Sequence, residues 1–163
     1  MGCIRHALSK KERKLLIKEI NEKYPFLNLS LKKTLEIGIC NGYTVYFYDG
    51  KPFIVKIDDK LIPLLKYLLK MKTEDIKIPK VVVDMGAVKH ILNGADVMAP
   101  GIVSIEGLFK KDDVVLVIDE KYRKPLAVGL ALYDSTEISN MRRGKVVLNI
   151  HFAGDRIWKL SYS

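Results

Sequence analysis

Residues 81–103 have the sequence VVVDMGAVKHILNGADVMAPGIV. Its first three residues are valines that follow Lys80, and this β-branched run predicts a strand over residues 80–83. Asp84 comes next and predicts the N-cap of a short helix over residues 85–93, because its carboxylate can accept free backbone N–H groups. The glycines at positions 94 and 101 predict a turn that leads into another strand. This strand–helix–turn–strand unit decides how the second half of the chain folds.

The residues after this unit predict further short elements. Strands are expected over residues 113–118 and 126–133, with a basic loop between them. A short helix is expected to start at residues 134–137 and to end at Gly144, because glycine favours the left-handed backbone after a helix. Residues 146–151 and 156–160 predict a closing hairpin. One short helix followed by many short strands predicts a small, partly closed β-barrel.

The first half of the chain predicts a helix followed by a β-meander. Ser9 and Glu12 have the spacing of a capping box, which predicts a helix that ends at Pro25. Leu16, Ile20 and Tyr24 recur at intervals of four and predict its buried side. Three strands are expected to follow, over residues 34–40, 43–48 and 51–57.

The turns of this meander are Asn-Gly at 41–42 and Asp-Gly at 49–50, which tolerate the positive φ angles of two-residue hairpin turns. A second helix is expected over residues 60–72, because the leucines of this segment recur at helical spacing. The first half is therefore expected to be an α+β domain with its own core.

The balance of charge differs between the two halves. The whole chain of 163 residues has a formal net charge of +9. Residues 1–77 hold 16 Lys+Arg against 9 Asp+Glu, a balance of +7, and residues 78–163 hold 12 against 10, a balance of +2. This difference predicts two domains, 1–77 and 78–163, with a joint near Pro79. The positive charge predicts attraction to polyanions through Coulomb steering and counterion release.

Several classes of protein are not indicated. No apolar run approaches the roughly 18 residues of a membrane span, and the basic N-terminus is not a secretion signal, so we expect a cytoplasmic protein without a membrane segment. Cys3 and Cys40 lack metal-ligand spacing and are expected to be reduced thiols, with neither a zinc site nor a disulfide. The P-loop, G-x-S-x-G and H-E-x-x-H motifs are absent, so we expect no catalytic residue, no metal and no cofactor.

Four blocks of the second half resemble a PUA domain, which is named for pseudouridine synthases and archaeosine transglycosylases. They are the segment at 81–103, FKKDDVVLVIDE at 109–120, PLAVGLAL at 125–132 and MRRGKVVLNIHFAGDRIWKL at 141–160. The blocks have the family's order, and together they cover residues 78–160 nearly without gaps. The resemblance implies an RNA-binding domain with the fold of a small pseudo-barrel.

The segment at 27–70 narrows the family. It reads LNLSLKKTLEIGICNGYTVYFYDGKPFIVKIDDKLIPLLKYLLK, and its pattern is similar to the pre-PUA domain of the malignant T-cell amplified sequence family and its archaeal relatives. The resemblance implies an α+β fold, in which an N-terminal α/β-meander domain precedes the PUA-type pseudo-barrel. It also implies tRNA or ribosomal RNA as a partner at the small ribosomal subunit. This chain ends at Ser163 without a SUI1 segment, so a SUI1-domain partner would be a separate protein.

By analogy with RNA-bound PUA domains, the contact surface comprises the helix after Asp84 and the turn and strand that follow. A glycine-rich turn lets backbone N–H groups approach a sugar-phosphate chain. Asp96 has the wrong charge for phosphate, so it either accepts a hydrogen bond from a base or holds the turn. The expected RNA-binding residues are Gly86, Lys89, His90, Asn93, Gly94, Ala95, Asp96, Val97, Met98, Pro100, Gly101, Arg142 and Arg143.

Three functions compete at this point. The first is an RNA-binding protein of translation that contacts the small ribosomal subunit, tRNA or both. The alternative is an accessory subunit that targets a pseudouridine- or archaeosine-forming enzyme to its RNA. The third is a scaffold for protein interactions whose basic surface is incidental.

Overall fold

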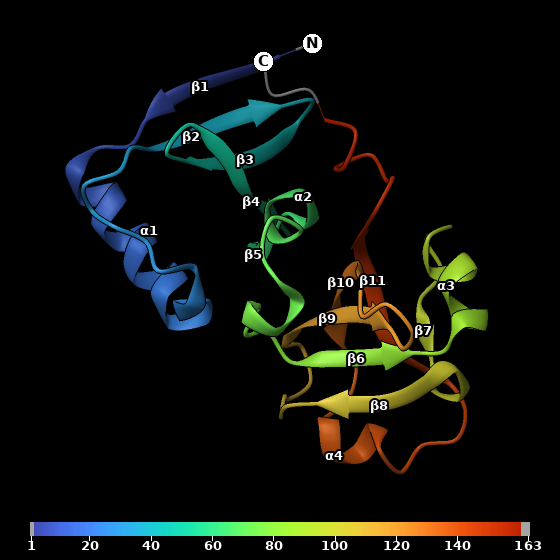
Figure 1. Ribbon diagram of the computed structural model, residues 1–163. Coiled ribbons are helices and arrows are strands. Elements are labelled where there is room, and N and C mark those ends of the chain that lie inside the picture. Colours follow the sequence, from blue (N-terminus) through green and yellow to red (C-terminus); the bar gives the residue numbers. More distant parts are fainter. Residues whose placement is uncertain (1, 161–163) are drawn as a thin grey trace. The chain divides into compact units, whose positions relative to one another are not determined.

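The computed structural model describes residues 2–160, so Met1 and residues 161–163 of the expected domains lie outside it. The chain divides into two compact units. Unit 1 holds residues 2–71, Asp75–Lys77 and residues 159–160, and unit 2 holds Lys72–Glu74 and Ile78–Trp158. Each unit is built on a sheet of its own (Figure 1). With few helices beside these two sheets, the expected α+β class is confirmed.

Unit 1 contains an antiparallel sheet whose strands follow one another in chain order. Asn41 and Asp49 have φ angles of 49° and 52°, and the glycines after them have 84° and 78°, so both expected two-residue turns are confirmed. The strands are β1 (Cys3–Ala7), β2 (Leu35–Cys40), β3 (Tyr43–Tyr48), β4 (Lys51–Ile57) and β5 (Lys60–Pro63).

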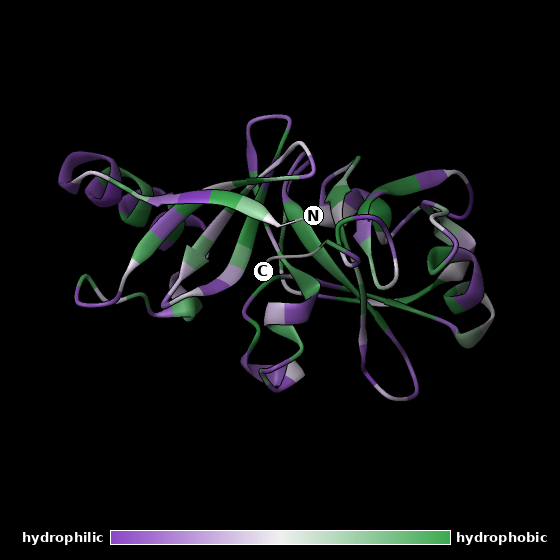
Figure 2. Cartoon of the chain, turned by 90° about the horizontal axis from the view of Figure 1, so that it is seen from above, coloured by the Kyte–Doolittle hydropathy of each residue, from purple (hydrophilic) through white to green (hydrophobic). Residues whose placement is uncertain are grey.

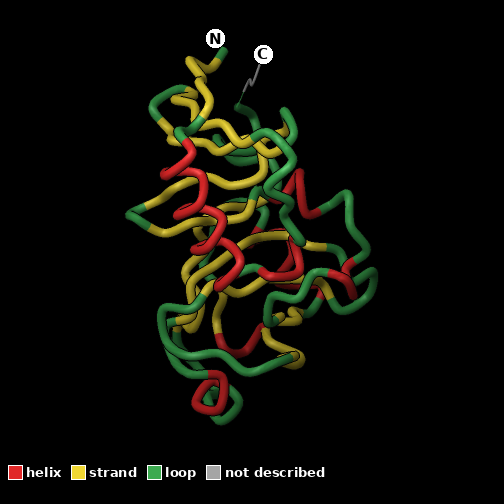
Figure 3. The backbone as a smooth tube through the Cα atoms, turned by 90° about the vertical axis from the view of Figure 1, so that its left-hand side faces the viewer, coloured by secondary structure: helices red, strands yellow, loops and turns green. Residues whose placement is uncertain are grey.

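Helix α1 (Lys10–Lys23) lies alongside this sheet (Figure 3). The Ser9 hydroxyl accepts the Glu12 N–H at 3.2 Å, and the Glu12 carboxylate accepts the Ser9 N–H at 3.1 Å, which confirms the capping box. Charged residues on its exposed side colour much of the helix purple in Figure 2. The buried Tyr24 hydroxyl donates to the Leu61 carbonyl at 2.6 Å and thereby fastens the end of α1 to β5.

The helix expected over residues 60–72 is wrong at both ends. Asp58 and Asp59 have φ angles of 48° and 63°, which turn the chain tightly and pair Ile57 with Lys60. Residues 60–63 therefore form β5, and α2 spans only Leu65–Leu68. Four of the five leucines are buried as their spacing indicates, but a hairpin and a short helix bury them instead of one long helix; they are Leu61, Leu64, Leu65 and Leu68.

The expectation of reduced cysteines is also wrong. Cys3 and Cys40 form a disulfide, with their Cα atoms 4.4 Å apart. They are direct partners in the pairing of β1 with β2, and β1 had no counterpart among the expected strands. The pairing of β1 with β2 brings the two cysteines together. Because β1 was not expected, the spacing of the cysteines in the sequence gave no indication of a disulfide.

Unit 2 contains a mixed sheet with the order β7-β11-β10-β9-β6-β8. The only parallel neighbours in this sheet are β6 and β9; the other pairs are antiparallel. Its elements are β6 (Lys80–Val83), α3 (Met85–Ile91), β7 (Val97–Met98), β8 (Ile102–Glu106), β9 (Val114–Asp119), β10 (Pro125–Ala131), α4 (Ser135–Ile138) and β11 (Lys145–Phe152).

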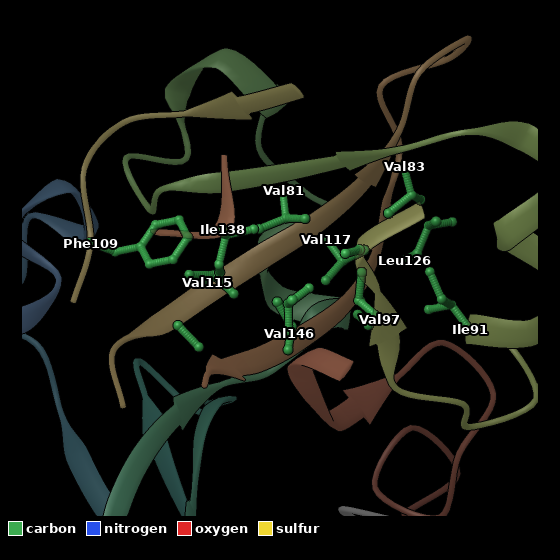
Figure 4. Close-up of a cluster of buried hydrophobic side chains, with 14 residues drawn as sticks. Val81, Val83, Ile91, Val97, Phe109, Val115, Val117, Leu126, Ile138 and Val146 are labelled. Atoms are coloured by element: carbon green, nitrogen blue, oxygen red, sulfur yellow. The ribbon is translucent and has the colours of Figure 1, made fainter. Parts of the chain in front are cut away.

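A cluster of buried hydrophobic side chains fills unit 2 (Figure 4). Val81 and Val117 come from the paired strands β6 and β9, and Val146 comes from β11. Ile91 joins the cluster from α3 and is 2% exposed. Each such side chain contributes about 1.5–3 kcal/mol by burial, so α3 is anchored to the core through Ile91.

The strand expected over residues 156–160 is wrong. Residues 153–159 form turns in which the Asp155 carboxylate accepts the N–H groups of Phe152 at 2.9 Å and Trp158 at 2.8 Å. The same carboxylate lies 2.9 Å from Nδ1 of the buried His151. An aspartate that binds nearby backbone N–H groups competes with strand pairing, and it ends β11 here.

We expect the disulfide to stabilise unit 1 substantially. In the chain-entropy description, closing a loop of this length raises the free energy of unfolding by about 4 kcal/mol. Cys40→Ser should therefore lower the midpoint of urea unfolding under oxidising conditions, and reductant should lower that of the native chain equally. A Cys3→Ser, Cys40→Ser double variant is the control and should not respond to reductant. Equal midpoints of the native chain with and without reductant would contradict this prediction.

We expect the turn around Asp155 to weaken in acid. Burial raises the pKa of Asp155, but the hydrogen bonds from His151, Trp158 and Phe152 outweigh it, so the pKa lies below its usual value. A lowered pKa stabilises the folded state above the unfolded-state pKa of about 4, and the benefit is lost as the pH falls through the folded-state pKa. Asp155→Asn should cost about 2 kcal/mol at pH 7. Urea unfolding from pH 7 to pH 2 should show this cost shrinking with acidity, and a constant cost would contradict the assignment.

Candidate functional site

The candidate site starts with α3, and local sequence features determine where this helix begins and ends. The Asp84 carboxylate accepts the Ala87 N–H at 2.8 Å, which confirms the expected N-cap. The helix ends at Ile91, two residues before the expected end, and the chain then turns through Gly94. Gly94 has a φ angle of 93°, and a Cβ there would lie 3.2 Å from the Phe152 ring. Both the backbone conformation and the limited space therefore favour glycine at this position.

A pocket of about 280 Å³ opens between α3, the turn after it and β7, and we call it the α3–β7 pocket. Its floor is mostly apolar, and His90 and Asp96 supply ionisable side chains. Gly101 lies in the wall of the pocket, and a Cβ at this position would lie 3.3 Å from the Ala87 Cβ. The lining residues are Ala87, His90, Ile91, Ala95, Asp96, Val97, Met98 and Gly101.

Asn149 of β11 holds the turn that forms one wall of this pocket. Its side-chain amide donates to the carbonyls of Ile91 and Ala95, each at 3.0 Å. Its backbone N–H donates to the Asp96 carboxylate at 2.8 Å. We call these three hydrogen bonds the Asn149 clasp. They join the turn to β11, which lies between β7 and β10 in the sheet, so the pocket is preformed.

Asp96 has a second partner in Lys145, whose ammonium lies 3.0 Å from the carboxylate. The aspartate thus holds the turn, and its charge is compensated at the rim of the pocket. Next to Lys145, the Gly144 carbonyl accepts the Ala99 N–H at 2.8 Å. This bond brings the exposed loop with Arg142 and Arg143 to the chain that follows β7.

The structure brings six of the expected RNA-binding residues together in the α3–β7 pocket: His90, Ala95, Asp96, Val97, Met98 and Gly101. The remaining ones do not line it. Gly86, Lys89 and Asn93 lie exposed on α3 or just after it, and Pro100 is exposed beyond β7. Gly94 lies under Phe152, and Arg142 and Arg143 lie in the loop before β11.

Sequence reasoning missed the residues that support the site. Ala87 and Ile91 were not among the expected RNA-binding residues, yet both line the pocket. Asn149 and Lys145 were not singled out, although an asparagine within the apolar run of β11 is a signal that its amide has fixed partners. Met85 at the start of α3 and Leu92 just after its end are 39% and 36% exposed, so both add apolar surface beside the helix.

Within residues 2–160, no cluster of three or more His, Cys, Asp or Glu side chains has the arrangement of a metal site. None of the helices described has the length and hydrophobicity that a membrane span requires. The α3–β7 pocket combines an apolar floor, a histidine and the backbone groups of a turn, and Lys145 lies at its rim.

Comparison with known proteins agrees with this arrangement. Residues 79–153 match the PUA domain, and residues 4–71 match a domain of unknown function (DUF1947). The translation machinery-associated protein 20 of Saccharomyces cerevisiae is 32% identical over 80% of this chain and 74% of its own length. The malignant T-cell-amplified sequence 1 homolog of Drosophila melanogaster is 30% identical over 85% and 81%. This chain belongs to their family.

Three archaeal proteins are also similar to this chain. An uncharacterized protein of Methanocaldococcus jannaschii is 42% identical over 94% of both chains. A solved hypothetical protein from Pyrococcus horikoshii is 37% identical, with a TM-score of 0.82 over 96% of this chain and 98% of that one. A solved PUA-domain protein from Aeropyrum pernix has the same TM-score at 30% identity, over 96% and 90%. The expected pre-PUA and PUA architecture of the family is confirmed, and its PUA domain indicates RNA binding.

We expect Gly94→Ala to loosen the wall of the α3–β7 pocket. An alanine at a positive φ angle costs about 1–2 kcal/mol, and the contact with the Phe152 ring adds to that cost. Gly144→Ala is a matched control, because its φ angle is 97° but nothing lies within 4 Å of the added Cβ. Urea unfolding should show a larger loss for Gly94→Ala, with faster amide exchange at residues 94–96. Equal losses would show that the ring contact is unimportant.

Proposed function

We propose that this chain is a translation-associated RNA-binding protein that contacts the small ribosomal subunit, tRNA or both through its PUA domain. The observation that carries the proposal is the convergence of expected RNA-binding residues on one preformed pocket. An apolar floor and backbone groups suit a base or a sugar, and the cations around the pocket suit phosphates. The names of the relatives associate them with the translation machinery.

The role proposed is binding without catalysis, in the cytoplasm. The pocket provides His90 and a carboxylate already engaged with Asn149 and Lys145, a poor arrangement for acid–base chemistry. We further propose that the partner in translation includes a separate SUI1-domain protein, as the family resemblance implies. A purified SUI1-domain protein should then copurify with this chain in the absence of RNA.

We expect Lys89→Glu with Arg142→Glu to weaken RNA binding. Two lost phosphate contacts should reduce the affinity for tRNA about ten-fold at moderate salt and lower the slope of log K against log salt by about two. The control is Lys110→Glu with Lys111→Glu, the same charge change in the loop before β9, where both side chains are exposed. Fluorescence anisotropy with labelled tRNA measures both quantities. Equal losses for the two double variants would contradict a localised site.

Cosedimentation on sucrose gradients tests the cellular role. With small ribosomal subunits of Methanocaldococcus jannaschii, the source of the 42%-identical relative, the native chain should appear in the subunit fractions and the Lys89, Arg142 variant should not. Copurification with an RNA-modifying enzyme, without ribosomal subunits or tRNA, would favour the targeting-subunit alternative. Binding of partner proteins but no structured RNA would favour the scaffold.

A further inference from the structure

A second pocket lies entirely within unit 1, and neither the fold nor the proposed function accounts for it. Its volume is about 290 Å³, and we call it the aromatic–lysine pocket. It is formed by the 3-10 helix Pro25–Leu27, the start of β4 and the end of α2 with the residues after it. The lining residues are Phe26, Leu27, Lys51, Tyr67, Lys70 and Met71.

The two aromatic rings of this pocket are held in place before any ligand arrives. Phe26 packs edge-on against the buried Tyr24, with ring centroids 6.4 Å apart and planes at 82°. Tyr67 packs against the fully buried Phe53, with centroids 5.8 Å apart and planes at 60°. Rings that are already ordered lose little conformational entropy when a flat ligand stacks on them.

The two lysines give the pocket a positive rim. Lys51 and Lys70 are exposed, and neither forms an ion pair within residues 2–160. No acidic residue is among those that line the pocket. The nearby Asp49 is in an ion pair with Lys33, at 3.8 Å. The uncompensated charge of the rim therefore favours an anionic ligand.

The tyrosine also offers a hydrogen-bond donor. Partial burial raises the pKa of Tyr67 above its usual value, and Tyr48 and the negative charge of Asp49 raise it further. The hydroxyl therefore stays neutral at physiological pH and keeps its proton. A neutral phenol beside lysines can donate to a base, a sugar or a phosphate.

We propose that the aromatic–lysine pocket binds one unpaired nucleotide of an RNA strand, with its base against the Phe26 and Tyr67 rings and its phosphates at Lys51 and Lys70. Aromatic side chains beside cations are the usual means of holding single-stranded nucleic acid without reading its sequence. A volume just below the roughly 300 Å³ at which pockets for drug-sized ligands begin suits one base. That the anion is RNA rests on the proposed function and on the +7 balance of residues 1–77.

The direct test is a nuclear magnetic resonance titration of the full chain with a six-nucleotide oligoadenylate. Backbone amides at residues 26, 27, 51, 67, 70 and 71 should shift together, in addition to any shifts at residues 85–101. Shifts at 85–101 alone would overturn this proposal and leave the proposed function standing. Shifts at the unit 1 residues alone would support this proposal and contradict the proposed function. The absence of shifts in both regions would reject the two proposals together.

Two further ligands identify the chemistry that is recognised. Adenosine monophosphate at the same concentration should produce weaker shifts, because it lacks the neighbouring phosphates of a strand. Equal affinity for the mononucleotide would mean that the ligand is a free nucleotide and not RNA. A hexaglutamate peptide should leave the pocket residues unshifted, and shifts as large as those with oligoadenylate would show attraction to charge alone and overturn the proposal.

Variants of the pocket complete the test. Tyr67→Leu keeps an apolar side chain but removes the ring, and it should weaken oligoadenylate binding at this site about ten-fold. Lys51→Gln with Lys70→Gln changes only exposed side chains, so it tests the site even if Tyr67→Leu impairs folding. Lys56→Gln is the matched control, an exposed lysine on the same strand β4 as Lys51. Unchanged binding in the double lysine variant, or an equal loss in Lys56→Gln, would overturn the proposal.

Discussion

The shape of the α3–β7 pocket depends on the Asn149 clasp. One amide group and one backbone N–H of β11 fix the carbonyls of Ile91 and Ala95 and the carboxylate of Asp96. Backbone hydrogen bonds such as that from the Ala95 N–H to the His90 carbonyl, at 3.0 Å, join the turn to the end of α3, and the clasp fixes the turn against the sheet. Because β11 lies between β7 and β10 in the sheet, the clasp transfers the rigidity of the sheet to the pocket wall.

The parts of the fold that sequence predicted well are those in which local chemistry and burial agree. The capping box at Ser9, the two Asx-Gly turns and the Asp84 cap are decided within a few residues. The prediction of a helix at residues 60–63 was wrong, because apolar spacing indicates which residues are buried but not which element buries them. The type of element depends on the turn before it. The strand expected at residues 156–160 was also wrong, since hydrogen bonds to the Asp155 carboxylate replace strand pairing there.

Only residues that line the α3–β7 pocket were predictable from the sequence, and the residues that hold its wall in place were not. Exposed or turn-forming residues such as His90 and Gly101 are recognisable from type and position, and they do line the α3–β7 pocket. Asn149 lies more than fifty residues further along the chain, so its role becomes visible only through the register of β11. The disulfide has the same origin, because it needs β1 to pair with β2. The aromatic–lysine pocket likewise gathers residues from three separate segments.

The brevity of β7 has a consequence for self-association. It has two residues and forms one border of the unit 2 sheet, so one side of its backbone is not bonded to another strand of that sheet. A long open border would invite a second molecule to add a strand and would promote aggregation. Two residues are too few for that, yet enough to present peptide groups beside the pocket. At this border the domain thus keeps backbone polarity available at the pocket rim without offering a long template to a second copy.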